Sequence, residues 1–356
     1  MHFIMPGRVL PVALVCCSLG LVTGGCSGGS SGRDSSSSTR ASSANGSAVA
    51  GAVAPGTVTS AEAARVHANE LGKIMILEYH NIENKSGAYY QPPDQLRKDL
   101  QQLYDNGYAT MDIHDYVTGN ISTPAGKTPV VLTFDDATIG QFRYLPGGES
   151  IDPNCAVGIL NDFAAAHPGF GHHATFFVLP SGFGQSGLKA AKYRYLVSHG
   201  YGIGNHTWTH PIMTHKTPLQ VQEELGRDDI DIHAIIPDYR VDILAYPFGS
   251  RPKTQGKPDD TYIASGSWQG HPYKISAAFL VGAEPAPSPY SSKLKPYAIP
   301  RVQAIEKDLV SWIARFKANP RQKFISDGDP GSVSIPASMA SQLNRNAVSD
   351  RKVVTY

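Results

Sequence analysis

The chain has 356 residues, of which 41% are hydrophobic and 9% aromatic. This length suits two average domains, or one barrel-sized domain of about 250 residues with further segments at its ends. The 31 Lys and Arg residues nearly balance the 30 Asp and Glu residues, and both signs are scattered along the chain. The sequence therefore lacks the basic stripe expected of a protein that binds nucleic acid or an anionic membrane surface.

Residues 1–26 have the features of an export signal. An apolar stretch from Val9 to Val22 follows Arg8, and small residues lead to Cys26. The stretch is too short for a transmembrane helix and matches the hydrophobic region of a signal peptide. The segment before Cys26 resembles a bacterial lipoprotein processing site. We therefore expect export, with a lipid anchor on Cys26 at the outer face of the cytoplasmic membrane; ordinary cleavage and secretion is the alternative.

Composition divides the rest of the chain into three segments. Residues 27–66 are predicted to be a flexible linker, because ten serines and six glycines fall among the thirty residues from 27 to 56. As a Gly/Ser coil this linker would reach on the order of 30 Å. Residues 67–319 are expected to form the folded domain, and 320–356 an extension of unassigned role. Cys155 is the one cysteine after Cys26, so no disulfide framework is expected in the folded part.

Apolar runs typical of strands alternate with segments of helical spacing. The run 73–79 is mostly apolar, as expected of a buried parallel strand. Leu96, Leu100 and Leu103 recur at helical spacing, and Asn106-Gly107 ends this pattern. The remaining predicted elements are strand 129–134, helix 157–166, strand 174–179, helix 189–198, strand 201–204 and a helix from Pro218. This alternation favours a parallel sheet covered by helices, either an open doubly wound sheet or a closed barrel.

Two adjacent aspartates, Asp135 and Asp136, follow the predicted strand 129–134. In barrels and open α/β sheets the carboxyl ends of the strands line the active site, and neighbouring strand residues point in opposite directions. One carboxylate can then bind a cation while the other accepts a proton from water. The alternative is an aspartate pair that makes a turn or caps a helix.

Two histidines, His206 and His210, come just after the predicted strand 201–204. On a helical turn, residues four apart project from one face, about 6 Å apart along the axis, so both rings can approach one ion at about 2.0–2.1 Å. Together with one carboxylate they make the two-histidine, one-carboxylate set that catalytic zinc sites use. Taken alone, the pair is also compatible with a surface helix.

Five segments of the chain carry recognisable motifs in a fixed order. They are Leu77–His80, Val131–Asp136, Ala174–Val178, Gly204–Pro211 and Ala245–Gly249. The series resembles the polysaccharide deacetylases of carbohydrate esterase family four, which share the NodB-homology domain, and the resemblance extends over residues 73–317. The Tyr-His pair that ends the first segment resembles one subgroup of this family.

The resemblance implies a fold, a metal and a reaction. The implied fold is a distorted (β/α) barrel with fewer than eight complete units. A divalent metal, most often Zn²⁺, would be bound by Asp136, His206 and His210, with Asp135 as the general base and the backbone N–H of Phe248 as an oxyanion donor. The implied reaction is hydrolysis of the linear amide C–N bond of N-acetylglucosamine-type units in a cell-envelope or extracellular polysaccharide. An acetylated polysaccharide or oligosaccharide is therefore the expected substrate.

Three positions bear on how far these roles carry over. Ala137 stands where a glycine usually follows the aspartate pair, and it suits the site if its φ is negative. Ala245 stands where the motif usually has an arginine that pairs with the base. Arg301 resembles an arginine of the Tyr-His subgroup, and we expect it to support the site; the alternative is a surface arginine.

The histidine that protonates the leaving amine in this family, spaced as Leu-x-x-His, is not found after Arg301. His80 and His271 are therefore the candidates for the general acid. Without a positioned acid, turnover would fall by about 10²–10⁴-fold.

Two other functions remain open from the sequence. The same site would serve a polysaccharide O-acetyl esterase, and a comparison of acetyl-xylan with chito-oligosaccharide separates the two activities. A catalytically weakened carbohydrate-binding relative is the other alternative, suggested by Ala245 and the unassigned acid. A serine hydrolase is disfavoured, because the G-x-S-x-G match at 28–32 lies in the predicted linker, without the strand–turn–helix context that it needs.

Overall fold

The computed structural model describes residues 56–85 and 87–356. The described residues belong to one compact unit. The predictions for the signal segment, for Cys26 and for most of the linker lie outside the described residues. No helix within those residues has the length and apolar composition of a transmembrane span.

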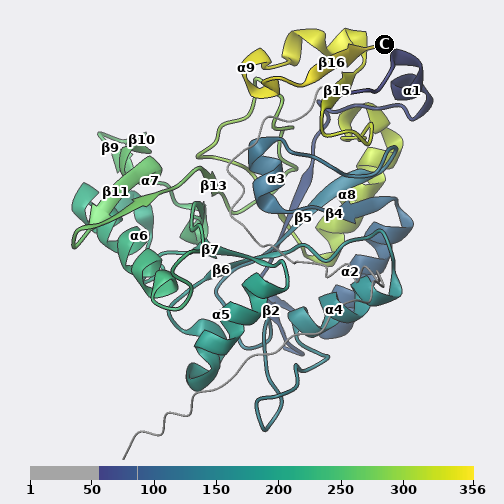
Figure 1. Ribbon diagram of the computed structural model, residues 1–356. Coiled ribbons are helices and arrows are strands. Elements are labelled where there is room, and N and C mark those ends of the chain that lie inside the picture. Colours follow the sequence, from purple (N-terminus) through teal and green to yellow (C-terminus); the bar gives the residue numbers. More distant parts are fainter. Residues whose placement is uncertain (1–55, 86) are drawn as a thin grey trace, which may run out of the picture. The chain divides into compact units, whose positions relative to one another are not determined.

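One parallel sheet forms the centre of this unit (Figure 1). Its strands follow the order β13-β8-β7-β6-β5-β1-β14, and β4 pairs with the first residues of β5. The bounds are Met75–Tyr79 (β1), Tyr108–Thr110 (β4), Thr128–Phe134 (β5), Thr175–Val178 (β6), Gly202–Asn205 (β7), Ile243–Ala245 (β8), Ala277–Phe279 (β13) and Val302–Gln303 (β14). The sheet is a distorted, incomplete barrel, so the expectation drawn from the resemblance is confirmed.

The strands are mostly apolar because both faces of the sheet are buried. Successive residues of β1 alternate between two hydrophobic clusters: Ile76 packs with Val131 and Phe177, whereas Leu77 packs with Leu132 and Phe176. The predicted strands agree with β1, β5, β6 and β7 to within two residues at each end.

Helices follow the strands and lie around the outside of the sheet (Figure 1). They are α2 (Pro93–Asp105), α3 (Ile113–Thr118), α4 (Ala156–Ala166), α5 (Lys189–Ser198), α6 (Pro218–His233), α7 (Thr261–Ala264) and α8 (Glu306–Ala318). Helix α2 buries Leu96, Leu100 and Leu103, as its spacing predicts. Thr217 caps α6 through a reciprocal pair of hydrogen bonds with Gln220, and Pro218 occupies the first turn, where its missing N–H costs nothing.

Short elements complete the fold. They are β2 (Asn81–Ile82), β3 (Tyr90–Gln91), β9 (Lys253–Thr254), β10 (Lys257–Pro258), β11 (Ser265–Trp268), β12 (His271–Lys274), β15 (Ser332–Ile335), β16 (Lys352–Thr355), α1 (Ser60–Arg65) and α9 (Arg345–Val348). Strands β11 and β12 form an antiparallel hairpin that packs on α6.

The end of the predicted linker is structured, which differs from the expectation for residues 27–66. Thr59 and Glu62 form a capping box at the start of α1, and Ala63 packs with Val354 of β16. Residues 320–356 belong to the same compact unit, because β15 and β16 pair with each other and α1 packs against them. The short helix is therefore held by contacts with the distant carboxyl-terminal segment.

A partly buried ion pair network joins α3 to the start of β8. The two ring nitrogens of His114 lie 3.2 Å from Asp112 Oδ1 and 2.8 Å from Asp242 Oδ1. Burial opposes the charged form, but the hydrogen bonds to these two carboxylates dominate and raise the pKa of His114 to about 9.

Because the pKa of His114 is higher in the folded protein than in the unfolded chain, its stabilising contribution should be complete below about pH 6.5 and lost as pH rises through about 9. The shift corresponds to on the order of 3 kcal/mol. Urea unfolding at intervals from pH 6 to pH 10 should show this loss. The His114→Gln variant should lack it over the same interval, and a parallel loss in both proteins would contradict the assignment.

Candidate metal centre

The structure brings together the three residues expected to bind a metal. Asp136 follows β5, and His206 follows β7; these two strands flank β6, so their carboxyl ends lie at one edge of the sheet. His210 comes from the loop after His206. Candidate ligand atoms of Asp136, His206 and His210 all lie within 4.8 Å of one another.

The donor atoms have the spacing of a tetrahedral site. Nε2 of His206 and Nε2 of His210 each lie 3.4 Å from Asp136 Oδ1. Ligand atoms around zinc, at bond lengths of about 2.0–2.1 Å, lie roughly 3.3–3.4 Å apart. The other ring nitrogen of His206 lies 2.9 Å from the carbonyl oxygen of Ala245, which fixes the tautomer that leaves Nε2 free to bind a metal.

The electrostatics of the site favour a bound cation. Burial opposes protonation of His206, yet the neighbouring carboxylates of Asp135 and Asp136 raise its pKa above the ordinary value. The side chains of Asp136 and His210 are 26% and 28% exposed, whereas that of His206 is 2% exposed. The cluster is therefore anchored in the interior and open to solvent on one side, as a catalytic metal site requires.

The two histidines do not lie on a helical turn, so the geometric basis given for their spacing is wrong. Residues 206–210 form a loop in which Thr207 and His210 have φ of 71° and 54°. Asn205 Oδ1 accepts a hydrogen bond from the Thr207 N–H, and Thr207 Oγ1 accepts one from the His210 N–H. Glu224 of α6 accepts two more from Thr209. These hydrogen bonds hold the loop in the left-handed conformations that bring both rings to Asp136.

The condition under which an alanine suits position 137, a negative φ, is not met. Ala137 is buried and has φ of 47°, and the preceding Asp136 has φ of 79°. A left-handed conformation costs an alanine about 1–2 kcal/mol, which glycine avoids. The left-handed backbone at position 137 thus explains why a glycine is usual there.

The Ala137→Gly variant should be about 0.5–1 kcal/mol more stable than the native protein, because relief of the left-handed strain exceeds the added entropy of the unfolded chain. Denaturant unfolding of the two proteins measures the difference. Ala165→Gly on the exposed side of α4 is the matched control, and it should instead lower stability by about 0.5–1 kcal/mol. Equal losses in both variants would show that Ala137 is unstrained.

Arg301 lies against the expected base. Its Nη1 and Nη2 donate hydrogen bonds to Asp135 Oδ1 and Oδ2 at 2.8 and 2.7 Å, and Nη1 also donates to Thr133 Oγ1 at 3.0 Å. Burial disfavours the carboxylate, but the Arg301 guanidinium dominates and holds the pKa of Asp135 well below its usual range. Arg301 itself is fully buried, which excludes the alternative of a surface arginine.

Glu78 was missed as a site residue by the sequence analysis, although it belongs to the first motif. Its Oε2 lies 3.4 Å from Arg301 Nε and accepts a hydrogen bond of 3.1 Å from the Gly282 N–H. A side chain at position 282 would collide with the Arg301 carbonyl, so only glycine permits this approach. Burial, opposed in part by Arg301, raises the pKa of Glu78 to about 7. The sequence signal that could have identified Glu78 as a site residue was its charge inside the mostly apolar run 73–79.

His80 lies beside this buried group. Its Nε2 is 3.7 Å from Glu78 Oε1, an oxygen that has no hydrogen-bond partner among the described residues. A ligand atom of His80 also lies within 4.8 Å of Asp135. Burial lowers the pKa of His80. The structure thus places this candidate acid next to the base.

The two remaining residues that the sequence proposed for catalysis, Phe248 and His271, lie in different places relative to the metal cluster. Phe248 belongs to the turn Pro247–Gly249, with φ of 57°, and its exposed ring packs edge-on against His210 at 4.7 Å. No acceptor for its backbone N–H lies in the part of the chain that the structure describes. His271 lies in the exposed hairpin strand β12, opposite Trp268, and the structure does not bring it to the cluster.

The structure thus combines an incomplete parallel barrel with an Asp-His-His cluster, a candidate metal site, at the carboxyl ends of its strands. Residues 122–257 match the polysaccharide deacetylase family, within the span over which the sequence motifs resemble it. This match to polysaccharide deacetylases agrees with the resemblance that the sequence motifs indicated. The Tyr-His subgroup stays a prediction.

Solved structures share the fold. The deacetylase PplD from Streptococcus pyogenes, in complex with acetate, is 20% identical over 67% of this chain and 97% of its own, with a TM-score of 0.50. IcaB from Ammonifex degensii is 18% identical over 68% of this chain and 96% of its own, also with a TM-score of 0.50. At these identities the likeness concerns the fold.

Proposed function

We propose that this protein is a metal-dependent polysaccharide deacetylase that hydrolyses the N-acetyl group of N-acetylglucosamine-type units, with Zn²⁺ as its metal. The observation that carries the proposal is the Asp136–His206–His210 cluster with the Arg301-bound carboxylate of Asp135 beside it. Zinc is favoured by the donor set of two imidazoles and one carboxylate with 3.4 Å spacings. When bound, the metal would polarise the acetyl carbonyl and lower the pKa of a water molecule at the site.

Asp135 is proposed as the proton acceptor. Arg301 keeps its carboxylate ionised at neutral pH and fixes the plane of the group through two parallel hydrogen bonds. Its Oδ2 lies 4.0 Å from His206 Nε2, which directs this oxygen toward the cluster. Asp135 would remove a proton from the water whose oxygen bonds to the acetyl carbon.

His80 is proposed as the proton donor to the departing nitrogen. As the C–N bond breaks, the sugar amine must gain a proton, and His80 lies near Asp135 with part of its ring open to solvent. Glu78 Oε1, 3.7 Å away, is placed to orient the imidazole. The backbone N–H of Phe248 would donate a hydrogen bond to the carbonyl oxygen as its negative charge develops.

The membrane attachment is a separate proposal that rests on the sequence. We propose that the protein is exported and held at the outer face of a bacterial cytoplasmic membrane through lipid on Cys26. The apolar stretch 9–22 and the small residues before the cysteine support this proposal. Such a location would suit an acetylated cell-envelope polysaccharide as the substrate.

The function is tested by incubating the zinc-loaded protein with chito-oligosaccharide and with acetyl-xylan. We expect equal amounts of acetate and free amine from the first and little acetate from the second. The His80→Asn variant should lower kcat by about 10²–10⁴-fold without changing the bound metal. His271→Asn, the matched control on the exposed hairpin, should retain the native rate.

Three results would contradict parts of this proposal. Release of acetate from acetyl-xylan alone would make the protein an O-acetyl esterase. Binding of glycans without release of acetate would make it a weakened relative. A native rate in the His80→Asn variant would remove His80 as the acid.

A further inference from the structure

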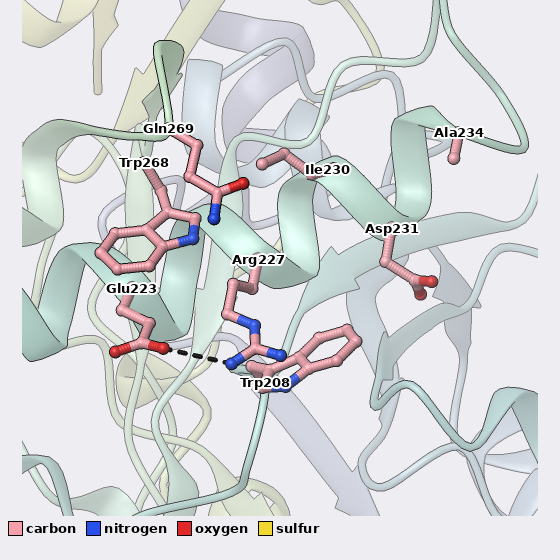
Figure 2. A pocket seen from close by; sticks show the side chains of 8 residues that line it. All are labelled: Trp208, Glu223, Arg227, Ile230, Asp231, Ala234, Trp268 and Gln269. Atoms are coloured by element: carbon pink, nitrogen blue, oxygen red, sulfur yellow. Dashed lines mark hydrogen bonds and ion pairs between the residues drawn. The ribbon is translucent and has the colours of Figure 1, made fainter.

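A pocket separate from the metal cluster lies beside α6 (Figure 2). Its volume is about 510 Å³, within the range of about 300–1,000 Å³ usual for ligand sites. Two of the three tryptophans of the chain line it. The side chains that carry the argument are Trp208, Glu223, Arg227, Asp231, Trp268 and Gln269.

Contacts among the aromatic and charged groups of this pocket orient their side chains. Arg227 stacks on the indole of Trp208 at 4.5 Å and donates a hydrogen bond of 3.1 Å to Glu223 (Figure 2). Trp268 packs directly on Gly226 of α6, where any larger side chain would collide with it. Such preorganisation lowers the entropic cost of binding a ligand.

The chemistry of the pocket suits a pyranose ring. Sugars combine apolar C–H faces, which pack on aromatic rings, with a rim of hydroxyl groups that need both donors and acceptors. Trp208 and Trp268 offer the aromatic surfaces, Arg227 and Gln269 offer donors, and the carboxylates of Glu223 and Asp231 offer acceptors. The charges of both signs pair locally, which disfavours a polyanion as the ligand.

Chain connectivity links this pocket to the catalytic cluster. Trp208 lies between His206 and His210 in the same loop, so one segment carries both metal ligands and one wall of the pocket. The pocket and the cluster therefore lie beside the same short loop.

We propose that this pocket is a carbohydrate-binding subsite that holds a pyranose unit of the polymer while another unit reacts. The inference rests on the proposed function for the identity of the polymer. Its consequence is a preference for long substrates over short ones, because only a long chain occupies the pocket and the metal cluster together.

The test uses the full-length zinc-loaded chain with Trp268→Ala and, as a second variant, Glu223→Gln. Both should raise KM for a long chitin-derived oligosaccharide by about 5–10-fold, which corresponds to the loss of one aromatic contact or one charged hydrogen bond. The kcat for a single acetylated sugar unit should be unchanged. Trp312→Ala, on α8, is the control and should leave both values at the native level. Thermal unfolding verifies that each variant is folded.

A binding experiment separates this inference from the catalytic one. In the Asp135→Asn background, titration with the same oligosaccharide, followed by tryptophan fluorescence, gives the Kd. Adding Trp268→Ala should raise this Kd by about 5–10-fold. If no acetate is ever released but this loss is seen, the subsite stands and the proposed function fails. Unchanged KM and unchanged binding in folded Trp268→Ala and Glu223→Gln would overturn the subsite.

Discussion

Replacement of Arg301 by methionine should lower the free energy of unfolding by about 3–5 kcal/mol, because it leaves the carboxylates of Asp135 and Glu78 buried without their shared cation. Methionine retains much of the apolar volume of the arginine side chain. The loss of stability therefore reports mainly on the missing charge. Deacetylation should fall by at least about 10²-fold, since the base loses both hydrogen bonds that orient it. Urea unfolding of the two metal-free proteins measures the loss of stability. Acetate release by the zinc-loaded proteins measures the loss of activity.

The control for this prediction is Arg315→Met. Arg315 is exposed on α8, where it stacks over Trp312 at 4.6 Å, and its replacement should change stability by no more than about 0.5 kcal/mol. Equal stability losses at positions 301 and 315 would mean that the buried ion pairs have no special energetic role. Native activity in a folded Arg301→Met protein would remove Arg301 as the residue that positions the base.

Removal of a metal ligand should have the second large effect. The His206→Ala and Asp136→Asn variants should lose bound zinc and lower acetate release by on the order of 10³-fold or more, since the metal is expected to supply several kcal/mol of transition-state stabilisation. Metal analysis after gel filtration, together with the acetate assay, measures both losses. Asp136 is partly exposed, so Asp136→Asn should remain folded.

A matched histidine provides the control for the ligand variants. His215 is exposed in the loop that follows the cluster, and His215→Asn should retain both metal and activity. Full metal content in the Asp136→Asn and His206→Ala proteins would contradict the assignment of these residues as ligands. Loss of metal without loss of acetate release would separate metal binding from catalysis.

The strands and helices were largely predictable because their causes are local. Burial of both sheet faces makes β1, β5 and β6 mostly apolar runs, and capping residues such as Thr217 indicate where a helix starts. The short helix α1 was not predicted. Only Ala63 of its six residues is buried, and contacts with β16, almost 300 residues away, hold it in place.

The closure of the sheet could not be read from the sequence. Alternating strands and helices fit both an open sheet and a barrel, and the pairing of β4 with one end of β5 is a matter of long-range register. The resemblance to a family, and not the pattern of residues, supplied the incomplete barrel.

The site shows the same division between local and distant causes. Asp136, His206 and His210 were identifiable because they follow predicted strands, although the loop around His210 is not the helical turn that was assumed. The contact of Arg301 with Asp135 spans 166 residues of chain, and no local pattern indicates it. Glu78 was not predicted as a site residue because its role depends on its ion pair with the same Arg301.

The most direct test of the metal-dependent mechanism is a titration of the chelated full-length protein with Zn²⁺, followed by acetate release from chito-oligosaccharide. We expect no release from the chelated protein, a rise in proportion to added zinc and a plateau at one equivalent, with no recovery in the Asp136→Asn variant. Release from the chelated protein at the rate of the zinc-loaded one would contradict a metal centre at Asp136, His206 and His210.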